Sequence, residues 1–231
     1  MNQTPLERIR SRGYWEIVIR PATFEAGLVP YNRLEPIVEM SRVQLRGWDF
    51  PHRWKGNLQR GQDWVQDGGT WMNYLEQWRF HQSGLFVYYA AQRLDWIELA
   101  DHLGTWKHQY MHVEPGQQLG AIEVLHRFTD LYEFAARLAL TEEFIAIEQV
   151  HIDITIAGLE NRSLRFEDPR WMPGLLPPHV SMPEYTAHYA YPRQTLIGTA
   201  RDLSLIGAGE FFVRFAYEPS MQTLRTMADQ R

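Results

Sequence analysis

One group of histidines has a spacing that is compatible with metal binding. His108 and His112 are four residues apart, and His102 precedes them by six residues. If this stretch forms a helix, the two imidazoles share one face, where they can hold Zn²⁺ or another divalent cation. No glutamate follows the first histidine as in the HExxH metalloprotease motif, so the alternative is a set of exposed or packing histidines.

A second group combines a histidine with a carboxylate. His151 and Asp153 lie on the polar side of segment 149–157, in which apolar residues alternate with polar ones. An aspartate can orient an imidazole for general-base catalysis, so this pair supports a hydrolase, metal-assisted if the first group binds a cation. The alternative is the solvent side of an amphipathic strand, with Asp153 paired across a hairpin to Arg162 or Arg165.

Tryptophan and arginine are concentrated in the first half of the chain, where eight of the nine tryptophans lie between Trp15 and Trp106. These two residue types are enriched at protein-binding hot spots, and aromatic rings with arginines also suit single-stranded nucleic acid. Because tryptophan is also a large apolar side chain, we expect five or six of the nine in the core. The densest polar–aromatic segment is 42–60, and its predicted binding residues are Arg46, Trp48, Asp49, His52, Arg53, Trp54 and Lys55.

The composition excludes several classes of catalytic site. The chain has no cysteine, which excludes disulfides, cysteine-ligated zinc, iron–sulfur clusters and a cysteine nucleophile. Lys55 and Lys107 are the only lysines, and neither lies in a phosphate-binding P-loop motif. The chain also lacks the GxSxG, GxGxxG and EF-hand patterns. We therefore expect no cofactor and favour a protein that is not an enzyme.

The charge of the chain is uneven along its length. The net charge is −5, but residues 1–60 carry nine arginines and one lysine against six acidic residues. This excess can form a basic patch for nucleic acid, or folding can neutralise it against the acidic remainder, which is the preferred interpretation. The polar first residues and the absence of any apolar run of about 20 residues predict a soluble, cytoplasmic protein that is not bound to membranes.

Hydrophobic periodicity predicts the secondary structure. Two long amphipathic helices are expected at about 118–140 and 195–215, a shorter one at 31–41, and a last one after Pro219. The expected strands are 13–21, 43–48, a hairpin of 75–80 and 85–91, 149–157 and 185–191. Asp67-Gly68-Gly69 is typical of a turn, and 163–168 is expected to pair with 149–157 after a turn at 158–161.

This order of elements predicts an α+β fold, in which the two long helices pack on an antiparallel sheet of short strands. The length of 231 residues is compatible with a single domain over 1–231. Pro115-Gly116 marks a possible subdivision into a strand- and Trp-rich half, 1–116, and a helix–hairpin–strand–helix half, 117–231.

Four segments resemble a family of bacterial proteins of about this length to which no activity is assigned. They are 10–21 (RSRGYWEIVIRP), 42–52 (RVQLRGWDFPH), 133–140 (EFAARLAL) and 211–225 (FFVRFAYEPSMQTLR). The resemblance implies a bacterial origin and one continuous unit, and it transfers no catalytic residue. It is compatible with an accessory subunit of a stress or anti-phage defence system.

Three functional hypotheses follow from the sequence. The preferred one is a non-enzymatic recognition or accessory subunit that binds a protein partner or nucleic acid through the Arg/Trp-rich first half of the chain, with segment 42–60 as the first candidate surface. The second is a hydrolase that uses His151 and Asp153 or the group of His102, His108 and His112. The third is a homo-oligomeric scaffold.

Overall fold

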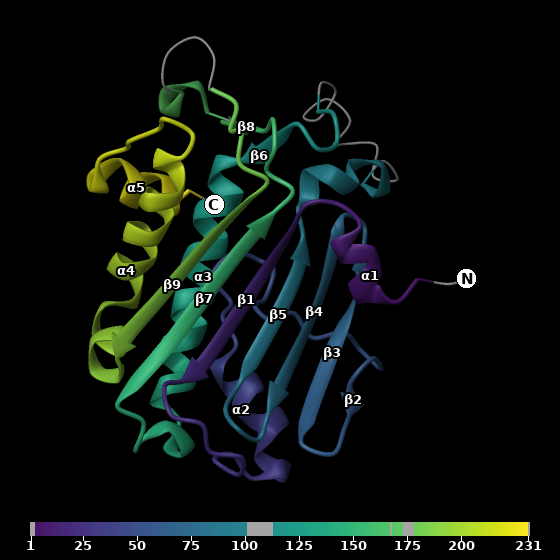
Figure 1. Ribbon diagram of the computed structural model, residues 1–231, viewed down its shortest axis with the longest axis vertical. Helices are drawn as coiled ribbons and strands as arrows, with labels where there is room; N and C mark the ends of the chain where they lie inside the picture. The colour runs from purple at the N-terminus through teal and green to yellow at the C-terminus, as the bar shows by residue number, and fades with distance from the viewer. Residues whose placement is uncertain (1–2, 101–112, 167, 173–177, 231) are drawn as a thin grey trace.

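The computed structural model describes residues 3–100, 113–166, 168–172 and 178–230, and its centre is a seven-stranded antiparallel sheet (Figure 1). The strands follow the order β2-β3-β4-β5-β1-β7-β9. Their bounds in that order are Gln59–Arg60, Trp64–Trp71, Tyr74–His81, Phe86–Ala91, Tyr14–Pro21, Gln149–Ala157 and Glu184–Pro192. Strand β1 lies between β5 and β7, so strands from both halves of the sequence share one sheet.

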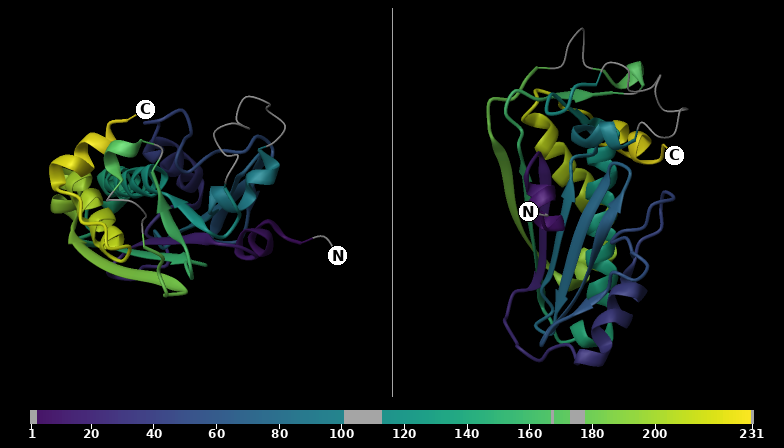
Figure 2. Two further views of the ribbon diagram at one scale, coloured as in Figure 1. Left: turned by 90° about the horizontal axis from the view of Figure 1, so that it is seen from above. Right: turned by 90° about the vertical axis from the view of Figure 1, so that its right-hand side faces the viewer.

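Helices cover mainly one face of this sheet (Figure 2). The two long helices are α3, Ala121–Leu140, and α4, Arg193–Val213, which pack against each other. The short helices α2, Leu34–Ser41, and α5, Met221–Ala228, contact α3 on the same side. The α+β fold and both long helices predicted from the sequence are therefore confirmed. Helix α3 begins three residues later than predicted and ends at the predicted residue, whereas both ends of α4 lie two residues earlier. No helix in the described part of the chain is long and apolar enough to span a membrane.

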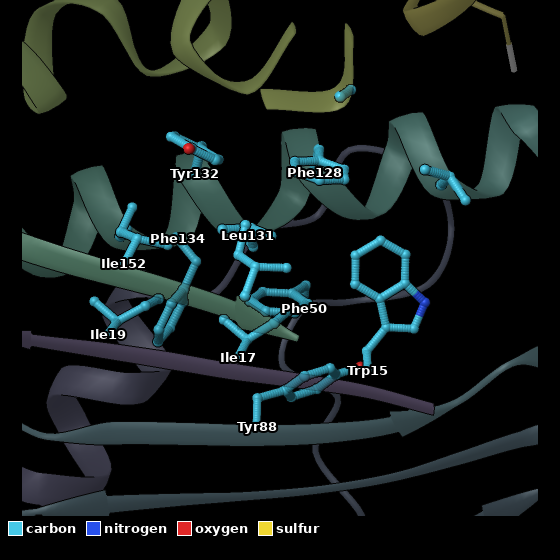
Figure 3. Packing of buried hydrophobic residues seen from close by; sticks show 14 of the residues in the cluster. Trp15, Ile17, Ile19, Phe50, Tyr88, Phe128, Leu131, Tyr132, Phe134 and Ile152 are labelled. Atoms are coloured by element: carbon cyan, nitrogen blue, oxygen red, sulfur yellow. The ribbon is translucent and has the colours of Figure 1, made fainter. Parts of the chain in front are cut away.

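Alternation along the strands explains why one face is covered. In β1 the side chains of Trp15, Ile17 and Ile19 are buried, whereas those of the residues between them are half-buried. Since successive strand side chains point to opposite faces, the apolar set packs under α3 (Figure 3). The opposite face carries polar residues, and the six-residue helix α1, Pro5–Arg10, lies over β4 and β5 there.

A buried ion pair ties the ends of several strands together. Asp95 lies in the 3₁₀ helix Arg93–Leu99 and accepts two hydrogen bonds from the Arg162 guanidinium, at 2.7 and 2.5 Å. The same carboxylate accepts the backbone N–H groups of Gly13 and Gly116, each at 2.9 Å. Asp95 therefore links the start of β1 and the segment before α3 to Arg162, which lies in the turn after β7.

Segment 163–168 does not pair with β7 as expected from the sequence. Strand β8, Ser163–Arg165, instead forms a parallel pair with β6, Gln118–Gly120. Strands β1 and β9 flank β7 over its whole length, so neither edge of β7 is free for β8. This arrangement also leaves Asp153 without the predicted partners Arg162 and Arg165, because it bonds other residues.

Candidate functional site

Segment 42–60 forms no regular element before β2, and it lies over the helix-side face of β3 and β4. The predicted strand 43–48 is wrong, because Val43 forms only an isolated bridge with Phe50. Gly47 adopts a φ of +71°, a left-handed conformation that reverses the chain at Trp48. The segment therefore folds back on itself as a loop.

Two buried carboxylates of the sheet hold the backbone of this loop. Glu76 of β4 accepts the N–H of His52 at 3.2 Å, and Asp67 of β3 accepts the N–H of Trp54 at 3.0 Å. The indole N–H of Trp78 donates to the carbonyl of His52 at 3.0 Å. Burial raises the pKa of both carboxyl groups, and the backbone bonds to them oppose this shift. Both carboxylates therefore act as loop anchors.

The predicted turn at Asp67-Gly68-Gly69 is wrong for a related reason, since all three residues lie inside β3. The chain turns instead at Met72, which has a φ of +52°. A Cβ atom at Gly69 would lie 2.7 Å from ring carbons of Trp54. The glycine thus leaves room for the loop to lie directly on the strand.

Five rings from the loop and the β3–β4 hairpin contact one another, and we call them the Trp48 cluster. Trp48 stacks on His52 at 4.0 Å between ring centroids, on Tyr74 at 4.1 Å and on Trp71 at 5.4 Å. Trp54 meets Trp48 edge-on at 5.8 Å. Trp71 is 48 % exposed, whereas the other four rings are partly buried. The cluster therefore presents one broad indole to solvent on a rigid aromatic base.

A buried polar network lies beneath the cluster. Glu76 accepts a hydrogen bond from the Tyr88 hydroxyl, and Arg127 of α3 donates to the same hydroxyl. The Arg127 guanidinium lies 4.0 Å from the Glu76 carboxylate. Burial raises the pKa of Tyr88 well above its ordinary value, so the phenol stays protonated. The network joins α3 to the strands that carry the loop.

The arginines of the loop are engaged within the protein. Arg46 donates to Asp130 of α3 at 2.6 Å, and Arg53 pairs with Glu35 of α2. Asp49 pairs with Arg42 of the same segment at 3.1 Å. Lys55 is exposed and has no ion pair among the described residues. The arginines of this segment are therefore paired by folding, but of these pairs only Arg46–Asp130 joins the first 60 residues to the acidic remainder, as the preferred interpretation of the charge pattern expected.

Arg93 is a cation at the Trp48 cluster that the sequence prediction omitted. Its guanidinium lies over the Tyr74 ring at 3.9 Å, within the range of a cation–π contact. No carboxylate in the described part of the chain forms an ion pair with it. The predicted site also omitted Trp71 and Tyr74. These two aromatic residues are three positions apart on either side of a hairpin turn, and this spacing could have indicated that their rings lie close together.

The described tryptophans are less buried than expected. Trp15, Trp78 and Trp96 are buried, which is fewer than the five or six predicted for the core. Trp48 and Trp54 are only partly buried because they cover β3 and β4 beyond the reach of α3. Tryptophan in this chain is therefore used as much for the surface of the loop as for the core.

His151 and Asp153 both lie on the face of the sheet opposite α3, but they do not bond each other. Asp153 accepts from His188 of β9 at 3.0 Å and lies 3.6 Å from the Arg20 guanidinium of β1. His151 contacts Gln149 at 3.3 Å. The pattern is that of cross-strand pairs on a polar sheet face.

The remaining candidate, His102 with His108 and His112, lies outside the described residues. Among the residues that are described, no group of three or more histidine or acidic side chains is arranged to hold a metal ion. Comparisons with protein-family models, with curated proteins and with solved structures find no match to this chain.

Proposed function

We propose that this protein is a non-enzymatic recognition subunit that binds a protein partner through the Trp48 cluster. The observation that carries the proposal is Trp71, a half-exposed indole held on stacked rings. Rigid aromatic side chains contribute strongly to binding because they bury a large area and lose little conformational entropy. The cluster is also anchored by Asp67 and Glu76, so little ordering is needed on binding.

A protein partner is favoured over nucleic acid by the charges around the cluster. Nucleic-acid affinity depends on free basic side chains that neutralise phosphates. Arg46 and Arg53 are already paired with Asp130 and Glu35, which leaves Arg93 and Lys55 as cations near the rings. The partner therefore inserts an apolar or aromatic side chain against Trp71 and places a carboxylate near Arg93.

The test compares Trp71 with Trp64, a matched control on the same strand. Trp64 lies on the opposite face of β3, where the Arg79 guanidinium covers its ring at 4.4 Å. A photo-crosslinking amino acid is introduced at position 71 or 64 and irradiated in cells of the source organism. Trp71→Ala and Trp64→Ala are then compared in nuclease-treated pull-downs.

We expect one protein to crosslink to position 71 and not to position 64, and to be lost from Trp71→Ala alone. Equal recovery with Trp71→Ala would show that the cluster is not the binding surface. Recovery of nucleic acid, or loss of the partner after nuclease treatment, would favour the nucleic-acid alternative. Substitution of Trp48, Arg53 and Trp54 is a poorer test, because these side chains also pack or pair within the fold.

A further inference from the structure

Strand β9 is a long strand at one end of the sheet. It spans nine residues, whereas the strand at the other end, β2, has only two. Long edge strands expose a row of backbone donors and acceptors that pair readily with another strand, and proteins therefore often keep them short. The edge formed by β9 is the one that lacks this protection.

The register identifies which backbone groups of β9 face outward. The N–H of Arg193 donates to the carbonyl of Glu148 at 2.8 Å, so these two residues form a hydrogen-bonded pair. The next opposed residues, Gln149 and Pro192, are then a non-hydrogen-bonded pair. Opposed pairs in an antiparallel ladder alternate between bonded and non-bonded, so Tyr191 and every second residue before it bond β7. The N–H and C=O groups that point away from the sheet belong to Glu184, Thr186, His188 and Ala190, whose side chains are all exposed.

A proline limits the length of this outward edge. Pro192 ends β9 and occupies an outward-facing position, at which it has no N–H to donate. A strand added to this edge therefore cannot continue its pairing past Pro192, which restricts the possible registers.

Exposed apolar side chains on α4 lie beside the same edge. Ile206 is 46 % exposed and Val213 is 47 % exposed. Both lie within about one helical turn of Glu210, whose carboxylate accepts a hydrogen bond from Tyr189 of β9 at 2.6 Å. The ring of Phe211, next to Glu210, lies 5.1 Å from that of Tyr185. The edge of β9 and this apolar pair therefore form one continuous surface.

We propose that β9 pairs antiparallel with β9 of a second copy of this chain, with the two-fold axis passing at Thr186. Outward-facing residues must oppose outward-facing residues, so this register places Thr186 opposite Thr186 and Glu184 opposite His188. About six ladder hydrogen bonds form. The two sheets continue into one, and the second copy covers Ile206 and Val213.

Charge complementarity favours a second copy in this register. Each Glu184 carboxylate faces an imidazole, and the pairing occurs twice because of the symmetry. His188 is 77 % exposed, and its Nδ1 atom lies 3.0 Å from Asp153. In the protonated imidazolium both ring nitrogens donate, so Nε2 can bond the glutamate while Nδ1 bonds Asp153. Opposed threonines and opposite charges are both favourable cross-strand pairs. The interface involves residues remote from the Trp48 cluster, so it is independent of the proposed recognition function.

The absence of cysteine allows a direct test of the register. A disulfide requires Cα atoms within about 7 Å, a distance that residues directly opposite each other satisfy. Thr186→Cys should therefore form an intermolecular disulfide under mild oxidation, whereas Ala190→Cys should not, because the two copies of position 190 lie far apart. Equal crosslinking of the two variants would overturn the register.

Association itself is measured by sedimentation or light scattering at tens of micromolar protein. We expect a dimer for the natural sequence and for Thr186→Val, and a monomer for Thr186→Pro, which loses an outward N–H that β7 does not use. Unchanged circular dichroism shows that Thr186→Pro still folds. Glu184→Lys should weaken the dimer by about tenfold or more, whereas Glu142→Lys, an exposed control outside β9, should not. A monomeric natural protein, or a Thr186→Pro dimer of unchanged affinity, would refute the proposal.

Discussion

The buried pair of Asp95 and Arg162 should be one of the most sensitive points of the fold. Its side chains are only 1 % and 3 % exposed, and the Asp95 carboxylate accepts four hydrogen bonds. Asp95→Asn keeps the shape of the side chain but removes its charge, which leaves the Arg162 guanidinium buried without a counter-ion. Breaking a buried pair in this way typically costs about 3–5 kcal/mol. A domain of this kind has a total stability of about 5–15 kcal/mol, so the loss is a large fraction.

Urea unfolding followed by circular dichroism measures this cost, with an unchanged slope indicating the same cooperative transition. The matched control is Asp202→Asn, which removes one partner of an exposed pair with Arg225 at 3.0 Å. The control should lose no more than about 1 kcal/mol. In Asp95→Asn/Arg162→Met the unpaired charge is gone, so the loss should be smaller than the sum of the two single changes. A loss below about 1 kcal/mol for Asp95→Asn would refute the argument that this pair ties the strand ends together.

Two further predictions concern pH and packing. Burial, and secondarily Arg46, lower the pKa of His126 to about 4. Between pH 6.5 and 4 the unfolded state therefore binds a proton that the folded state does not. Acidification through this range should lower the free energy of unfolding by about 3 kcal/mol. Burial raises the pKa of Asp130 to about 6 despite the opposing Arg46, so between about pH 4 and 6 the folded state retains a proton and stability falls by a similar amount as pH rises. In the natural sequence these two dependences of stability on pH oppose each other. Relative to it, the free energy of unfolding should fall more steeply with rising pH in His126→Gln and rise more steeply in Asp130→Asn. A dependence of this free energy on pH that is the same in both variants as in the natural sequence would contradict the argument. Gly69→Ala should displace the Trp54 ring, alter the near-UV circular dichroism and cost about 1–3 kcal/mol, whereas Gly198→Ala, whose added Cβ meets no atom within 4 Å, should be neutral or stabilising.

The predicted elements that were confirmed are those with strong periodicity. The strand at 149–157 and the helix at 118–140 each place apolar residues on one side, and tertiary packing only had to cover that side. The failures at 43–48 and 67–69 both involve the loop formed by segment 42–60, which folds back on itself and lies on β3. The carboxylate of Asp67 bonds the backbone of Trp54, so a sequence typical of a turn became a strand that supports a loop.

The candidate site was found only in part for a similar reason. Composition drew attention to Trp48, His52 and Trp54, which do lie together. It did not separate them from Arg46 and Arg53, whose acidic partners come from α3 and α2. Trp71 and Arg93 joined the site from other parts of the chain, since ring contacts depend on distances that local spacing does not encode.

The sequence by itself determined the class of fold and the residue types available for binding, because hydrophobic periodicity and composition are local properties. It also excluded cysteine chemistry and the common nucleotide-binding motifs. Only the tertiary structure decided which arginines are neutralised, which tryptophan meets solvent and which strand forms the long edge of the sheet. These outcomes depend on contacts between residues far apart in the chain, whose energies exist only once the whole sheet has assembled and removed them from water.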